Sequence, residues 1–151
     1  MIMKTLMMDE ADFLDFQLFG IASNFSDPAQ FVFHLNRVYE TQFSRCQDLD
    51  VKIEGEVSYY PTFEWEDCQS GILYYIIKNA AYSLNSSENE RTLSGLFDVA
   101  PPIIPQFKQY NYLLKVMDLD DVQLPMQEGA YIQKIVPLEI DHIKTINRLI
   151  F

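Results

Sequence analysis

The sequence predicts an α+β protein with a mostly antiparallel sheet, one main helix after strand 2 and a short C-terminal helix. Several segments alternate apolar and polar side chains with a period of two, which is typical of half-buried strands. In one long stretch, apolar side chains recur at helical spacing. The expected elements show no regular strand–helix–strand alternation, which favours an antiparallel sheet with helices on one face. Because 151 residues are the usual size of one domain, we expect a single globular domain over residues 1–151.

The first half begins with two expected strands, residues 3–8 and 12–21, around a short acidic turn. The main helix follows. Asp27 suits its N-cap, Pro28 its first position, and Gln30 the place where a capping box has Glu or Gln. Its apolar side chains recur at helical spacing, so one face should pack on the sheet. These side chains are Phe31, Leu35, Val38 and Tyr39.

Residues 57–66 alternate cleanly between apolar and polar side chains and predict one strand. Pro61 has no backbone N–H to donate, so this strand should lie at a sheet edge. After a turn at residues 67–71, residues 72–77 are apolar on both faces. This pattern predicts a more central strand that pairs with residues 57–66 as a hairpin.

The second half begins with residues 79–95, which are rich in Ser and Asn and predict the longest and most mobile connection. Residues 110–117 and 131–140 predict two further strands. Asp141 should then cap a terminal helix. The apolar side chains of that helix are Ile143, Ile146 and Ile150.

Charge restricts the partners of the protein. Eleven basic residues against twenty-two acidic ones give a formal charge of −11 and a pI near 4.4. This balance disfavours direct nucleic-acid binding, which needs Lys and Arg to displace counterions, and also disfavours anionic membranes. It attracts basic protein surfaces, although net charge can equally serve solubility alone.

Few residues could carry catalytic or metal chemistry. His34 and His142 have no nucleophile that the sequence places beside them, so each is expected at a helix surface or in the core. Cys46 and Cys68 fit neither a disulfide framework nor a zinc site, so we expect free thiols in a reducing cytoplasm. The five glycines are scattered, which disfavours a phosphate-binding loop. We therefore expect no catalytic residue, no metal and no cofactor.

Two acidic groups allow a second interpretation. Residues 118–121 resemble part of a calcium loop but lack its glycine and bidentate glutamate, so a solvated turn is expected. Glu64 and Glu66 share one strand face and could do acid–base work only in a cleft that raises one pKa. A polar outer face explains them more simply.

The N-terminal apolar run is broken by Asp9 and Glu10, and no stretch is long enough to span a bilayer, so we expect a cytoplasmic protein without membrane association.

The most specific motif lies at residues 104–112, which read Ile-Pro-Gln-Phe-Lys-Gln-Tyr-Asn-Tyr. It resembles the signature Ile-Pro-Glu, three residues, Val-Asp-Tyr. The chain is thereby similar to the IPExxxVDY family of small bacterial proteins of unknown function, and weaker likenesses span most of its length. Gln106, Tyr110 and Asn111 depart from the signature's Glu, Val and Asp. A catalytic motif in the family would therefore be inactive here.

A structural role for the motif uses all of its positions. Ile104 would enter the core, Pro105 would fix the entry to a helical turn at residues 106–109, and Tyr112 would anchor the following strand. Gln106 and Asn111 would satisfy backbone groups of the turn.

Two consequences distinguish this role from a docking role. If Gln106 and Asn111 only satisfy backbone groups, returning them to the family's Glu and Asp should change stability little. In the docking alternative, the turn exposes Lys108 and Tyr110 to a partner.

The function expected from these observations is that of a non-enzymatic, acidic cytoplasmic module that docks on a basic protein partner. The resemblance implies a link to RNA-processing machinery or to acyl-chain synthesis, because genes of the family lie near those for ribonuclease III and a fatty-acid condensing enzyme. The alternative is a small ligand-binding protein or enzyme with a cleft near residues 104–112.

Overall fold

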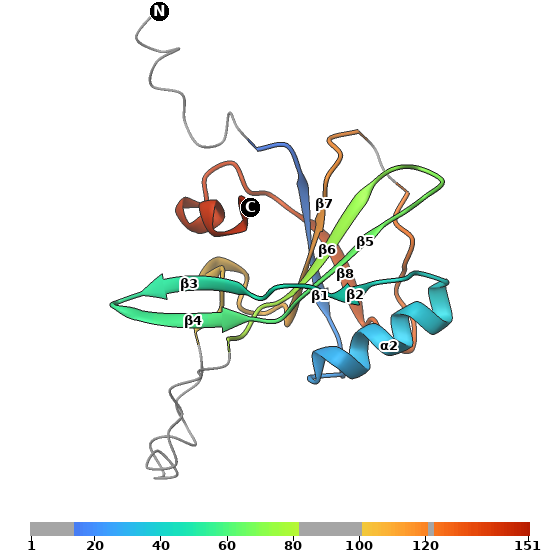
Figure 1. Cartoon of the computed structure of the whole chain (residues 1–151), viewed down its shortest axis with the longest axis horizontal. Helices are drawn as coiled ribbons and strands as arrows, with labels where there is room; N and C mark the ends of the chain where they lie inside the picture. The colour runs from blue at the N-terminus through green and yellow to red at the C-terminus, as the bar shows by residue number, and fades with distance from the viewer. Residues whose placement is uncertain (1–13, 82–100, 121–122) are drawn as a thin grey trace, which may run out of the picture.

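The computed structural model describes residues 14–81, 101–120 and 123–151 (Figure 1). Its main element is a six-stranded sheet with the order β2-β5-β6-β7-β1-β8, in which every pair of neighbours is antiparallel. A second, two-stranded sheet joins β3 and β4. The strands are β1 Gln17–Ala22, β2 Ser44–Arg45, β3 Leu49–Ile53, β4 Glu56–Tyr60, β5 Thr62–Glu66, β6 Leu73–Lys78, β7 Tyr112–Val116 and β8 Lys134–Leu138. The predicted α+β class with a mostly antiparallel sheet is confirmed.

The main helix, α2 (Pro28–Tyr39), begins where the sequence predicts. Asp27 accepts a hydrogen bond from the Ala29 N–H at 3.1 Å, and Pro28 occupies the first turn. Glu40 ends the helix in the left-handed conformation. Among the described residues α2 follows β1, the strand predicted at residues 12–21. The strand predicted at residues 3–8 lies outside the described residues.

One face of the sheet packs on α2, which Figure 1 shows lying across one end of the strands. The helix buries Phe31, Val32 and Leu35 against it. Val38, which the sequence assigned to this face, is instead 50% exposed. The sheet contributes a set of fully or nearly fully buried side chains: Ile21, Phe63, Tyr74, Ile76, Tyr112, Leu114 and Val116.

The second face is covered as well, so the expectation that helices cover only one face is wrong. Two 3-10 helices, η3 (Pro105–Phe107) and η4 (Lys144–Leu149), pack there with the hairpin β3–β4. All five residues of β7 are therefore buried. The predicted terminal helix is thus η4, a 3-10 helix, and no side chain caps it. Asp141 lies three residues before its start, too far to act as the cap.

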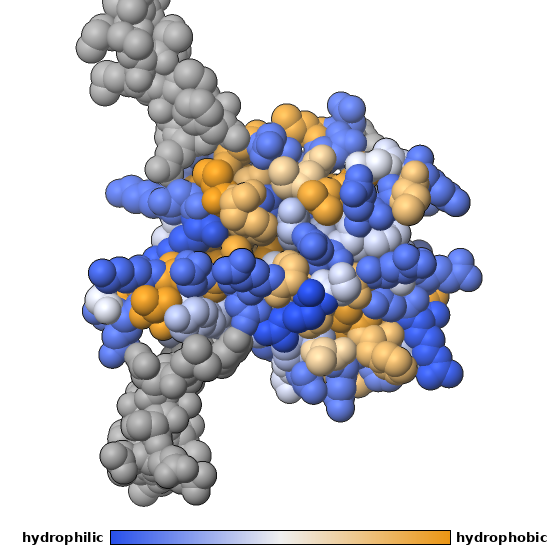
Figure 2. Space-filling view, in the orientation of Figure 1, coloured by the Kyte–Doolittle hydropathy of each residue, from blue (hydrophilic) through white to orange (hydrophobic). Residues whose placement is uncertain are grey.

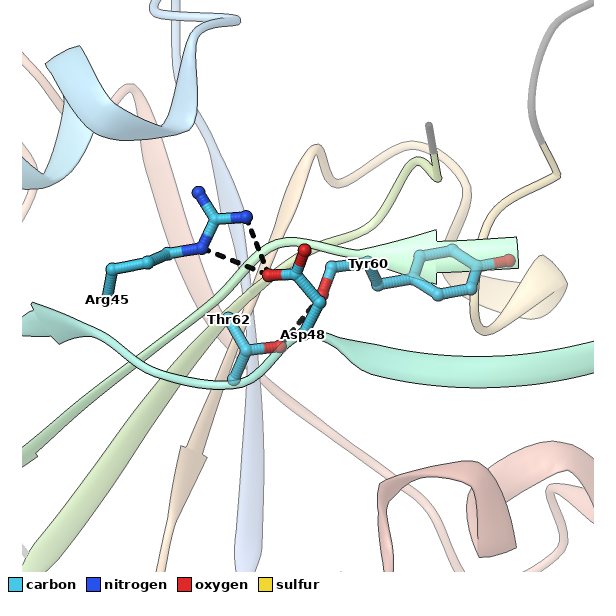
Figure 3. A network of polar contacts seen from close by, with 4 residues as sticks. All are labelled: Arg45, Asp48, Tyr60 and Thr62. Carbon is cyan, nitrogen blue, oxygen red and sulfur yellow. Dashed lines mark hydrogen bonds and ion pairs between the residues drawn. The ribbon is translucent and has the colours of Figure 1, made fainter. Parts of the chain in front are cut away.

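Residues 57–66 are two strands rather than one. Pro61 separates β4, in the hairpin, from β5, in the main sheet. Figure 3 shows the junction, where the Arg45 guanidinium pairs with the Asp48 carboxylate at 2.6 Å and the Thr62 hydroxyl donates to the Tyr60 carbonyl at 2.9 Å. Each contact bridges the point at which the chain passes between the two sheets.

The other expected strands are confirmed with shorter bounds. β5 and β6 form the predicted hairpin, and β6 lies inside the sheet between β5 and β7. The strands predicted at residues 110–117 and 131–140 are β7 and β8. Of the connection predicted at residues 79–95, residues 82–95 lie outside the described residues. In the ranges that the structure describes, no helix has the length and apolar character needed to cross a membrane.

Candidate functional site

The motif at residues 104–112 is built into the second face of the sheet. Its turn is closed by the Phe107 N–H, which donates to the Ile104 carbonyl at 3.0 Å, and by the Tyr110 N–H, which donates to the Phe107 carbonyl at 3.0 Å. Ile104 is fully buried, and Phe107 and Tyr110 are each 9% exposed. The turn is therefore held in the core by its apolar side chains.

Asn111 and Tyr112 tie the motif to the segment after β1. The Asn111 side chain accepts from the Ser23 N–H at 2.9 Å and donates to the Ser23 carbonyl at 2.8 Å. The buried Tyr112 donates its hydroxyl to the Phe25 carbonyl at 2.6 Å and stacks on Phe31 with ring centroids 4.0 Å apart. Burial, and then the Asp27 carboxylate, raise the pKa of the Tyr112 phenol above its ordinary range. Both residues therefore have structural contacts that fit the first interpretation of the motif.

The remaining motif positions differ from expectation. Gln106 is exposed, and its side-chain oxygen accepts from the Thr145 hydroxyl at 3.3 Å, while no backbone group in the described ranges bonds to its side chain. Tyr110 is not an exposed docking residue, because its ring packs on Gly20 of β1. Lys108 is exposed, as the docking interpretation requires, so only one of the two residues expected to face a partner does so.

Asn79, at the end of β6, completes the turn and was not singled out from the sequence. This buried side chain donates to the carbonyls of Phe107 and Tyr110 at 3.0 and 3.1 Å and accepts from the Ile104 N–H at 3.2 Å. An Asn after an apolar strand is a common turn signal, and nothing in the local sequence points to a partner about thirty residues away.

Both histidines and both cysteines lie in the described ranges. His34 stacks on Tyr131 with ring centroids 4.7 Å apart and lies beside Phe25, while His142 is exposed. Burial and then the Glu64 carboxylate raise the pKa of the Cys46 thiol to about 11, so at neutral pH it is protonated and a poor nucleophile. Cys68 is free and exposed. Across the three described ranges, His, Cys, Asp and Glu side chains form no group of three or more that could hold a metal ion.

A hollow of about 320 Å³ lies at the β5 edge of the sheet. We call it the edge hollow. Gln42, Ser44, Glu64, Trp65, Glu66 and Leu73 line it. It exists because β2 is only two residues long and pairs with Phe63 and Glu64 alone, which leaves the end of β5 without a neighbouring strand among the described residues. Because side chains alternate across a strand, Glu64, Glu66 and Leu73 share the second face, whereas the Trp65 indole stacks on Tyr74 on the first face. The hollow thus combines an aliphatic side chain and two carboxylates on one face, with Trp65 at its edge.

The electrostatic field around the edge hollow is negative. Glu64 and Glu66 are exposed and take part in no ion pair with a described residue. Burial is the main cause that raises the pKa of Tyr75, and the charge of Glu64 is the second. For Tyr74 the main cause is also burial, and the second is the charge of Asp67. Arg45 of the neighbouring strand β2 is engaged by Asp48. A cation that entered the hollow would therefore meet unneutralised carboxylates.

A buried lysine lies two strands further into the sheet. The pairing of neighbouring strands places Ser44, Glu64, Tyr75, Lys115 and Leu18 in one row on the second face. Lys115 is 1% exposed, and burial lowers the pKa of its ammonium to about 8. No motif marked this residue, because Lys in a strand is normally read as an outward-facing side chain.

Comparison with known proteins gives no match, since no family model, no curated protein and no solved structure is similar to this chain at a significant level. The fold itself defines an α+β protein whose sheet is covered on both faces. Its function is therefore inferred from its own residues.

Proposed function

We propose that the protein is a non-enzymatic, acidic cytoplasmic interaction module that docks on a basic protein partner, and that the edge hollow receives a Lys or Arg side chain of that partner. The observation that carries the proposal is the presence of two exposed carboxylates beside Leu73 that form no ion pair with any residue that the structure describes. A formal charge of −11 adds a long-range attraction toward basic surfaces.

The lining of the edge hollow fits a basic side chain in both of its parts. The aliphatic stem of Lys or Arg packs well on apolar surface, here Leu73, which pairs with Glu66 across the strands and shares its face. Its charged head then reaches the carboxylates of Glu64 and Glu66, and each charge-assisted hydrogen bond contributes about 1.5–3 kcal/mol. Because the end of β5 lacks a neighbouring strand among the described residues, an extended segment of the partner can also pair with its backbone.

The surrounding surface supports the same proposal. Several basic side chains within the described ranges are already engaged: Lys115 is buried, Arg45 pairs with Asp48, and Arg148 donates to the Ile103 carbonyl at 2.8 Å. Figure 2 shows that hydrophilic residues predominate on the visible face, with apolar residues in separate patches. Charge attraction, followed by a small apolar contact, is therefore the mode of association that this surface favours.

The alternative of an enzyme or ligand-binding protein with a cleft near residues 104–112 has less support. Ile104, Tyr110 and Tyr112 of that segment are buried in the core. The oxygen and the nitrogen of the Asn111 amide are both hydrogen-bonded to the backbone of Ser23. Neither the edge hollow nor the hollow beside β8 is lined by a motif residue.

Membership of the IPExxxVDY family is part of the proposal and is supported by the motif residues themselves. A link to RNA-processing machinery agrees with the charge, because proteins that bind RNA present basic surfaces, whereas acyl carrier protein is acidic.

A matched pair of double variants tests the proposal. Glu64→Gln with Glu66→Gln removes two charges from the edge hollow, and Glu54→Gln with Glu56→Gln removes two charges at the tip of the β3–β4 hairpin. The probe is a nine-residue peptide of alternating Lys and Thr, with its Glu-for-Lys counterpart as the charge-reversed control, and the measurement is the dissociation constant. We expect the first variant to weaken binding about tenfold, the size of one lost charge-assisted contact, and the second to weaken it less than about twofold.

Equal losses in the two variants would show that only net charge acts and would contradict the hollow as a site. For a native partner recovered by affinity capture, the association rate should fall as salt rises while the dissociation rate changes less. An association rate that is independent of salt would contradict the acidic module as a whole.

A further inference from the structure

Among the described residues, the buried ammonium of Lys115 has one hydrogen-bond acceptor. Its Nζ donates to the Leu149 carbonyl of η4 at 2.7 Å, and no carboxylate within the described ranges bonds to it. Three aromatic rings enclose it, with centroids 3.7 Å (Phe151), 4.7 Å (Phe16) and 5.3 Å (Tyr75) from Nζ. Cation–π contacts and one carbonyl offset only part of the hydration free energy that a lysine ammonium loses on burial.

Two of these partners belong to one short segment. Leu149 and Phe151 lie at the end of residues 144–151. This segment is also held by the buried side chains of Ile146 and Leu149 and by hydrogen bonds from Thr145 to Gln106 and from Arg148 to the Ile103 carbonyl. Phe151 itself is 49% exposed, although its ring is the closest to the ammonium. The covering of Lys115 is therefore a half-exposed aromatic ring and about two turns of 3-10 helix, which has weaker hydrogen-bond geometry than an α-helix.

We propose that residues 144–151 form a latch over this face of the sheet, which protonation of Lys115 loosens and deprotonation tightens. When the latch opens, the ammonium regains water. When it closes on the neutral amine, no charge is buried. The proton thus biases an equilibrium between a closed and an open position of one segment.

The direction follows from linkage. In the closed position the pKa of Lys115 is lowered to about 8, and in the open position it returns toward its ordinary value of 10.5. Between these values the open state binds more protons, so the closed state gains stability as pH rises from about 7 toward 10.5. These two pKa values correspond to about a tenfold increase in the closing equilibrium from pH 7 to pH 9.

The neighbouring charged groups do not reverse this direction. Asp15, just before β1, is the carboxylate that opposes the lowering of the Lys115 pKa. From β6, Tyr75 presents a phenol whose pKa is itself raised by burial and then by Glu64, which favours its neutral form. Beyond Tyr75 lie Glu64 of β5 and the Cys46 thiol. On η4, Lys144 is exposed, and Arg148 is bound to the Ile103 carbonyl.

Hydrogen exchange in the full chain tests the latch. The amides of Ile146 and Ile150 donate within η4, to Ile143 and Asn147, and report its opening, whereas the amide of Phe31 in α2 serves as an internal control. Labelling times are scaled to the intrinsic exchange rate at each pH. We expect protection of the two η4 amides to rise about tenfold between pH 7 and pH 9, and protection of the α2 amide to stay constant.

Two variants isolate the lysine. Lys115→Met keeps the volume and removes the charge, so its η4 amides should be strongly protected at both pH values. Phe151→Ala removes the closest ring and should return the pKa of Lys115, measured by NMR of lysine labelled at Cε, toward 10.5. The latch is refuted if the wild-type η4 amides exchange equally at pH 7 and pH 9, if Lys115→Met keeps the pH dependence, or if Phe151→Ala leaves the lysine titration unchanged.

Discussion

At the scale of single residues, the motif turn is held by side-chain amides that use both of their ends. Asn79 donates twice and accepts once within the turn, and Asn111 accepts from and donates to Ser23. A carboxylate of the same shape could accept but not donate. The family signature has Asp at position 111, and replacing a catalytic Asp with Asn would remove its function. In this geometry, however, the amide of Asn111 is the group that both hydrogen bonds need.

The two amide positions of the motif should respond differently to acid substitution. Asn111→Asp loses the donor to the Ser23 carbonyl and places negative charge against that oxygen, so we expect the free energy of unfolding to fall by about 1–2 kcal/mol. Gln106→Glu keeps the acceptor for the Thr145 hydroxyl at an exposed site and should change it by less than about 0.5 kcal/mol. Urea denaturation at pH 7 measures both. The expectation from sequence, that both exchanges are neutral, predicts equal midpoints instead.

At the scale of elements, close contacts between neighbours decide what each position tolerates. A Cβ added at Gly20 of β1 would lie 2.6 Å from ring atoms of Tyr110. At this position β1 and the motif turn are therefore closer together than any residue with a Cβ atom would allow. In the hairpin β3–β4, Glu54 and Gly55 form a two-residue turn with φ values of +52° and +85°. Such turns favour Asn-Gly, because a non-glycine residue other than Asn or Asp is strained at positive φ.

Gly20→Ala should destabilise the fold by about 1–3 kcal/mol through overpacking. The cause can be isolated with Tyr110→Ala, which loses ring packing but opens the space that the new methyl group needs. In that background Gly20→Ala should cost little, giving a coupling energy of at least about 1 kcal/mol in a double-mutant cycle of unfolding free energies. Additive effects would show that the contact between the two residues is not the reason for the glycine.

Glu54→Asn should stabilise the hairpin, since Asn adopts the left-handed conformation with less strain. We expect a gain of about 0.5–1 kcal/mol in the free energy of unfolding, measured by denaturant titration. Glu54→Gln is the matched control, because it removes the same charge and keeps the strain. If the two variants gain equally, charge rather than backbone conformation is responsible.

At the scale of the whole molecule, the excess of acidic residues opposes compaction as well as attracting basic partners. The described ranges contain a single ion pair, between Arg45 and Asp48, so few of the acidic groups there are neutralised by a direct contact. Repulsion among exposed carboxylates acts over a Debye length of about 8 Å at physiological ionic strength.

Screening should therefore stabilise the protein. We expect the thermal unfolding midpoint to rise by a few degrees between about 10 and 200 mM sodium chloride, a range in which repulsion is screened and chloride has little effect on apolar burial. Scanning calorimetry at pH 7 makes the measurement, and a midpoint that falls with salt would show that attractive charge pairs dominate instead. Potassium chloride serves as the control for ion-specific effects.

The sequence by itself determined the elements whose signals are local. The helix cap at Asp27, the alternation in β1, the β5–β6 hairpin and the net charge all follow from short patterns, because capping, side-chain period and composition need no distant partner. The β3–β4 hairpin carried a similar signal in Glu54-Gly55 between β-branched residues, and it was missed because the clean alternation through Pro61 favoured one long strand.

Only the tertiary structure decided the features that depend on neighbours distant in the chain. The edge hollow arises from the shortness of β2, the covering of the second face by η3 and η4 buries Tyr110, and the row of paired residues brings Lys115 beneath Phe151. Each depends on strand order and register, since pairing fixes which side chains share a face and which are shut away from water. The identity of a residue sets the chemistry it can perform, and the packing of distant segments sets whether its charge meets solvent, a ring or another charge.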